Sequence, residues 1–210
     1  MPSTFILAMV CLCATVPSLA QSGQRPVEGN PSLPNTVPTE LSGSINVDGQ
    51  VTSYRIHLLP INSFPSLPQA VAEQLTQRNC MIPQTYEAHM PENVVHASLE
   101  RTNSSDWAVL CSTQGAVSLL IFFGSNGAHP SVLATSSATD HLQAHDPTGV
   151  LGFNWGIDPA SPERIHQAQY GLKKRLPLLD HDALADSTID HRILYHFYSK
   201  SAWTLVEMPD

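Results

Sequence analysis

Alternating apolar and polar residues define a hairpin in residues 42–59. This segment reads SGSINV, then Asp48-Gly49, then QVTSYRIHLL. An Asp-Gly step between two alternating segments is a strong signal for a tight β-hairpin turn. We therefore predict a hairpin in which Tyr54, Ile56 and Leu58 share one face and the polar residues between them occupy the other.

A helix and a run of three strands are predicted next. In residues 68–79 the apolar Ala70, Val71 and Leu75 lie on one helical face, and a proline at the first turn is tolerated. Three apolar strands separated by short turns are predicted for residues 93–100, 107–112 and 116–123. We expect this meander to form the centre of the core, with the helix packed on it.

The C-terminal half has a weaker pattern. Residues 131–148 are predicted as mixed strand and loop, and residues 149–155 as a strand interrupted by Gly152. Ser161 and Pro162 favour the start of a short helix over residues 161–170. A final hairpin is predicted for residues 192–198 and 202–207. Together these elements predict an α+β fold: a single domain in which an antiparallel sheet, built from hairpins and a meander, carries one or two packed helices.

The N-terminus has the features of an export signal. Residues 5–16 form an apolar run that is shorter than the roughly 20 residues needed to span a bilayer. Ser18 and Ala20 supply the small residues expected before a cleavage site. We predict a signal peptide over residues 1–20. Lipidation at Cys11 or Cys13 and a buried N-terminal helix are the alternatives.

A proline-rich segment follows this signal. Residues 21–41 contain four prolines and almost no apolar periodicity, which predicts a disordered leader. The folded domain is then expected to span residues 42–210. No later segment is apolar enough to cross a membrane, so we expect a secreted or periplasmic protein with no membrane span in the mature chain.

Removal of residues 1–20 would leave one pair of cysteines, Cys80 and Cys111. In an exported chain a single remaining pair indicates a disulfide. Such a bond would join the end of the predicted helix to the middle strand of the meander. A catalytic thiol is the alternative, although an oxidising compartment tends to consume free thiols.

Composition excludes some classes of function. The formal charge is −8 with 10 Lys+Arg, which argues against a nucleic-acid partner because phosphate binding needs a basic surface. The ten histidines would cancel this charge if all were protonated in mild acid. The chain has no P-loop, no dinucleotide-binding glycine motif, no zinc-protease motif and no nucleophile elbow. We therefore expect no cofactor.

Acidic residues and histidines are concentrated in residues 180–196, DHDALADSTIDHRILYH. Carboxylates in a loop can bind a hard cation, and the candidate metal ligands are Asp180, His181, Asp182 and Asp186. The segment does not follow the EF-hand pattern, because Ala185 replaces the glycine and His191 replaces the final glutamate. A general acid/base role and a solvated, turn-forming loop are the alternatives. Elsewhere, Trp107, Trp155 and Trp203 are candidates for a sugar-binding cleft or for the core.

Several segments give the chain a resemblance to known proteins: NCMIPQ, NVVHASLE, DWAVLCS and SLLIFF, followed by Y-H-F at residues 195–197 and by Trp203, Leu205 and Asp210. Together they resemble uncharacterised exported proteins of soil bacteria, over most of residues 52–210. The resemblance implies export and a Cys80–Cys111 pair, and it implies no reaction. Ala183 and Leu184 depart from the H-D-G-I that those proteins have at this point.

Three functions remain open at this point. The first is an exported, non-enzymatic binding or interaction module with an unknown small-molecule or protein ligand. The second is a metal-assisted hydrolase that uses the Asp/His-rich loop at residues 180–191. The third is a thiol-dependent enzyme.

Overall fold

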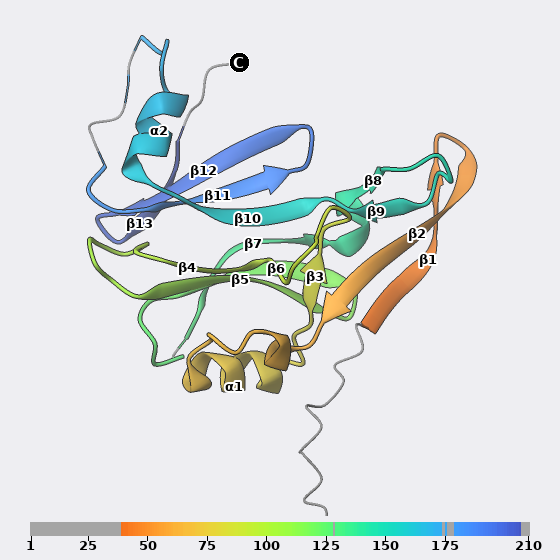
Figure 1. Ribbon diagram of the computed structural model, residues 1–210, viewed down its shortest axis with the longest axis horizontal. Helices are drawn as coiled ribbons and strands as arrows, with labels where there is room; N and C mark the ends of the chain where they lie inside the picture. Colours follow the sequence, from red (N-terminus) through yellow and green to blue (C-terminus); the bar gives the residue numbers. More distant parts are fainter. Residues whose placement is uncertain (1–38, 128, 174, 176–178, 207–210) are drawn as a thin grey trace, which may run out of the picture. The chain divides into compact units, whose positions relative to one another are not determined.

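A computed structural model describes residues 39–127, 129–173, 175 and 179–206. Within these residues the chain forms three mainly antiparallel β-sheets and two short α-helices (Figure 1). The predicted α+β class is therefore wrong, because strands grouped into three sheets build the fold and the helices are nine and seven residues long. The predicted signal peptide and residues 21–38 of the predicted leader lie outside the described residues.

The three strands of the predicted meander are confirmed as β4 (Val94–Ala97), β5 (Asp106–Thr113) and β6 (Ala116–Phe122). A fourth antiparallel strand, β7 (Ser131–Ser137), extends the sheet beyond the prediction. Its two central strands are buried on both faces, which explains their continuous apolar sequences. Trp107 and Val109 pack towards the first helix, whereas Ala108 and Leu110 belong to the core on the opposite face.

The first helix, α1 (Gln69–Gln77), covers this sheet, and a 3-10 turn over Ile61–Ser63 precedes it (Figure 1). Val71 and Leu75 are fully buried against the sheet. The predicted disulfide is confirmed: Cys80, just after α1, is bonded to Cys111 in β5 across a separation of 31 residues. Closing a loop of this length stabilises the fold by about 3.5–4 kcal/mol in the chain-entropy description.

A second antiparallel sheet packs over the other face of the meander. Its strands are β10 (Trp155–Ala160), β11 (Ala183–Thr188), β12 (Arg192–Ser199) and β13 (Ala202–Val206), and α2 (Pro162–Ala168) lies between β10 and β11. The final hairpin and the second helix, capped by Ser161, match the sequence prediction. The solvated, turn-forming loop considered for residues 180–196 is not found at residues 183–188. These residues form an internal strand whose first three residues are buried.

The third sheet contains β1 (Thr39–Val47), β2 (Gln50–Leu59), β3 (Ile82–Gln84), β8 (Leu142–Ala144) and β9 (Leu151–Phe153), with a 3-10 turn over Ala138–His141 before β8. The Asp48-Gly49 hairpin of β1 and β2 is confirmed, and Ile56 and Leu58 face the core. The chain then passes from this sheet to the next at Asn154, between β9 and β10, so the predicted strand over residues 149–155 is divided between two sheets.

Two strands share one edge of β2 and run towards each other. The parallel strand β9 pairs with Tyr54 and Arg55, and the antiparallel strand β3 pairs with His57, Leu58 and Leu59. Because both strands would need the same stretch of β2 to continue, both must leave the sheet where they meet. At that point the amide of Tyr86 donates a hydrogen bond of 2.8 Å to the carbonyl of Phe153.

One buried residue, Asn93, links the three sheets through its side chain and its backbone carbonyl. Its amide nitrogen donates to the carbonyls of Pro83 in β3 (2.7 Å) and Trp155 in β10 (3.3 Å), and its oxygen accepts from the amide of Ile157 (3.1 Å). Its backbone carbonyl accepts from the amide of Leu110 in β5 (3.0 Å). Asn93 is 2% exposed and has a φ of 68°, a left-handed conformation that asparagine adopts more readily than most residues.

We expect Asn93→Ala to lower the free energy of unfolding by about 3–5 kcal/mol, because it removes buried hydrogen bonds and strains the backbone. Asn93→Gly should cost about 1 kcal/mol less, since glycine adopts a positive φ freely. Asn103 is a matched control, because it is exposed and has a φ of 60°. Urea denaturation measures all three variants. If Asn93→Ala lowers the free energy of unfolding no more than Asn103→Ala does, Asn93 does not link the sheets.

Candidate functional site

The candidate metal ligands at residues 180–182 bind other parts of the protein. His181 is 7% exposed and contacts an Asp180 carboxylate oxygen at 2.6 Å and the carbonyl of Tyr198 at 2.9 Å. The Asp182 carboxylate accepts a hydrogen bond of 3.0 Å from the amide of Ser98, just after β4. These contacts hold the start of β11 against the end of β4.

The fourth candidate ligand, Asp186, lies in a different place. One carboxylate oxygen accepts a hydrogen bond of 2.6 Å from the indole nitrogen of Trp155, and the other lies 3.0 Å from Nε2 of His196. Asp186 and His196 side chains are each 15% exposed. Among the described residues, no group of three or more His, Cys, Asp or Glu side chains is arranged to hold a metal ion.

The three tryptophans lie apart. Trp107 is buried beside α1, and Trp155 is buried in the core between the sheets. Trp203 in β13 is half-buried and stacks at 6.1 Å on Phe123. Trp155 and Trp203 belong to the same hydrophobic cluster and Trp107 to another, and none of the three lines a recess described below.

A second polar pair lies between Ser136 and His141. The hydroxyl of Ser136 is 2.6 Å from Nε2 of His141, and the imidazole ring stacks on Trp155 at 4.3 Å. Burial lowers the pKa of His141, although the charges of Asp140 and Asp186 oppose this shift. The pair joins the end of β7 to the 3-10 turn that precedes β8.

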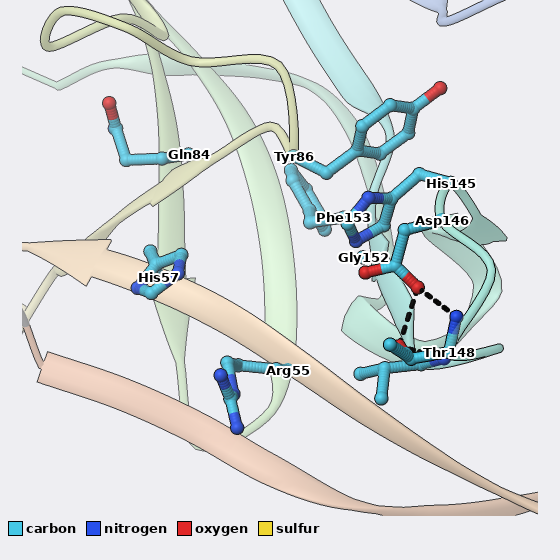
Figure 2. A pocket seen from close by; sticks show the side chains of 10 residues that line it. Arg55, His57, Gln84, Tyr86, His145, Asp146, Thr148, Gly152 and Phe153 are labelled. Atoms are coloured by element: carbon cyan, nitrogen blue, oxygen red, sulfur yellow. Dashed lines mark hydrogen bonds between the residues drawn. The ribbon is translucent and has the colours of Figure 1, made fainter.

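A cavity of about 410 Å³ lies where β3 and β9 meet beside β2 (Figure 2). Arg55 and His57 project from β2 on one side of this cavity, and His145, Asp146 and Thr148 lie on the other (Figure 2). The remaining lining residues come from the two meeting strands and their loops: Gln84, Tyr86, Val150, Gly152 and Phe153. We call this space the Tyr86 cavity.

Tyr86 and His145 form one wall of the Tyr86 cavity. Their rings stack with a centroid separation of 4.6 Å and an interplanar angle of 7°. Gly152 lies behind this stack: a Cβ atom there would come within 2.6 Å of Cβ of Tyr86 and 2.8 Å of Cδ2 of His145. The two rings can therefore pack directly against β9, because residue 152 has no side chain.

Hydrogen bonds fix the loop that carries Tyr86. The side chain of Gln84 accepts from the amide of Glu92 (2.9 Å) and donates to its carbonyl (3.1 Å). The Glu92 carboxylate in turn accepts from the amide of Thr85 (2.7 Å). Both ends of the loop over residues 85–92 are therefore held together, and the position of Tyr86 is set before any ligand binds.

Two further recesses border on Tyr86. One, of about 410 Å³, is lined by Tyr86, His145, Asp146 and the acidic Glu87 and Asp190. The other, of about 370 Å³, lies beside His57 and the segment 84–91. Partial burial, followed by the negative charges of Asp190 and Glu87, raises the pKa of the Tyr86 phenol. The Tyr86 phenol is therefore uncharged at neutral pH. Its side chain lies where the three recesses meet.

Asp146 presents a fixed negative charge at this site. One of its carboxylate oxygens accepts hydrogen bonds from the amide (2.8 Å) and the hydroxyl (2.5 Å) of Thr148. The hydroxyl bond is the main cause that lowers the pKa of Asp146, with smaller contributions from backbone amides and from His145. The carboxylate is therefore ionised at neutral pH.

Sequence reasoning missed the Tyr86 cavity. The alternation in β2 does place Arg55 and His57 on the polar face. Their partners Tyr86, His145 and Asp146 belong to loops that show no motif, and β3 and the β8–β9 hairpin bring these loops together from distant parts of the chain. Gly152, which interrupts the strand predicted for residues 149–155, is the one local signal of close packing there.

Comparisons with protein-family models, with curated proteins and with solved structures find no match for this chain. Within the described residues, no helix combines the length and the apolar character that a membrane crossing requires.

We expect Gly152→Ala to displace the ring stack and to lower the free energy of unfolding by about 1–3 kcal/mol, as overpacking does. Gly156→Ala in β10 is a matched control, since its Cβ would approach nothing closer than 3.3 Å. Urea denaturation gives the stability, and the ring-proton NMR shifts of His145 report the stack. Equal stability losses with an unchanged His145 signal would contradict the role of Gly152.

Proposed function

We propose that this chain is an exported, non-enzymatic binding protein that holds a small molecule in the Tyr86 cavity. The observation that carries the proposal is the cavity itself, which is built at the junction of β3 and β9 and fixed by the Gln84–Glu92 hydrogen bonds. Its volume of about 410 Å³ falls within the range of small-molecule sites, and its lining combines the apolar Val150 and Phe153 with a larger number of polar and charged side chains.

Binding, rather than metal-assisted hydrolysis, is proposed because of where the polar groups lie. Asp182 and Asp186 of the 180–191 loop accept hydrogen bonds from Ser98 and Trp155. The side chains of Arg55, His57 and Asp146 instead line a space that a ligand can fill (Figure 2). The disulfide and the apolar N-terminal run support export to an oxidising compartment.

The thiol-dependent enzyme has no support from the arrangement of the two candidate cysteines. Cys80 and Cys111 are bonded to each other and are each 4% exposed. Neither sulfur is presented as a nucleophile, which requires a free thiolate.

NMR screening with a mixture of small amines, carboxylates, amino acids, sugars and aromatic alcohols tests the proposal. We expect some compounds to shift the signals of Tyr86 and His145 and to be recovered chemically unchanged after prolonged incubation. The same compounds should bind Gly156→Ala normally and Gly152→Ala weakly. The proposal fails if no compound shifts these signals, if the hits bind Gly152→Ala as well as the wild type, or if a bound compound is converted to product.

A further inference from the structure

The charged groups of the Tyr86 cavity are separated by sign. Arg55 comes from β2 on one side, and Asp146 comes from the loop between β8 and β9 on the other (Figure 2). The structure gives no ion pair between them: Arg55 pairs with Glu40, and the carboxylate of Asp146 is bonded to Thr148. The cavity thus has a cationic wall and an anionic wall that face the same space.

Arg55 retains groups that can bind a carboxylate. Its Nε lies 3.2 Å from the Glu40 carboxylate, and both side chains remain exposed to solvent. The guanidinium also carries two terminal nitrogens besides the Nε that pairs with Glu40. These nitrogens suit a carboxylate, because a guanidinium binds one through two parallel hydrogen bonds.

Asp146 is arranged to bind a cation. Thr148 occupies one carboxylate oxygen, and Figure 2 shows the other turned back towards the cavity. The recess behind it is also lined by the acidic Glu87 and Asp190, and the Asp190 carboxylate accepts a hydrogen bond of 3.4 Å from the Tyr86 hydroxyl. An ammonium group placed here would contact a carboxylate and lie near an aromatic ring, and both attract it.

A ligand with a single charge would be repelled by one of the two walls of the cavity. A plain carboxylate bound to Arg55 would be repelled by Asp146, and a plain amine bound to Asp146 would be repelled by Arg55. A molecule with both charges would satisfy both walls at once.

We propose that the Tyr86 cavity binds a small zwitterion, with its carboxylate on Arg55 and its primary ammonium on Asp146. This inference rests on the proposed binding function and names the chemical class of the ligand. Free amino acids, longer amino acids and dipeptides share this chemistry, and the cavity volume of about 410 Å³ accommodates molecules of this size.

Calorimetric titration at pH 7.5 and low salt tests the inference with alanine, 4-aminobutyrate and alanylalanine, and with butyrate and butylamine as singly charged controls. At least one zwitterion should bind about ten-fold more tightly than either control. Arg55→Gln and Asp146→Asn should each lower the affinity for this zwitterion about ten-fold. Arg55→Gln should also improve butylamine binding, and Asp146→Asn should improve butyrate binding, because each removes a repulsive charge.

Glu40→Gln is the matched control, because Glu40 pairs with Arg55 but does not line the cavity. It should leave zwitterion binding intact or strengthen it. The inference is overturned if butyrate binds as tightly as the zwitterions and Asp146→Asn changes nothing, or if no zwitterion binds. In either case the binding function still stands when other compounds of the NMR mixture bind at Tyr86 and meet the criteria given for it above, and it falls when none binds.

Discussion

The hydrogen bonds of Asn93 are the constraint on which the arrangement of this protein depends. A single buried amide binds backbone groups of β3 and β10, and the adjacent carbonyl binds β5, so one residue fixes three sheets against each other. Removing a partner from a buried backbone group is costly in a protein core. The disulfide adds a second constraint on the opposite face of the meander, where it holds the end of α1 to β5.

The same junction determines the candidate site. Asn93 directly follows the loop over residues 85–92, and the bonds between Gln84 and Glu92 close that loop. The loop places Tyr86 where β3 and β9 meet along the edge of β2. A cavity forms there because neither strand can continue, and the absence of a side chain at Gly152 lets Tyr86 and His145 close its wall. The binding proposal is therefore a consequence of strand topology.

Local features of the fold could be predicted from the sequence. The Asp48-Gly49 hairpin, α1, the meander, the Ser161 cap and the final hairpin depend on neighbouring residues, and the disulfide followed from the cysteine count. The fold class could not be predicted, because strand patterns do not say how many sheets the strands will form. The Asp and His residues concentrated in residues 180–196 favour a loop, whereas residues 183–188 form a strand. The half-buried position of Asp186 depends on Trp155 and His196, which belong to other strands. The site was missed for a similar reason, since its walls come from separate segments.

The most direct test of this account is a crystal structure of the protein soaked with the zwitterion that binds most tightly. The account predicts electron density in the Tyr86 cavity, with the carboxylate of the ligand on the guanidinium of Arg55 and its ammonium group on the carboxylate of Asp146. Density at any other place, or a ligand in the cavity that contacts neither charged group, would contradict it.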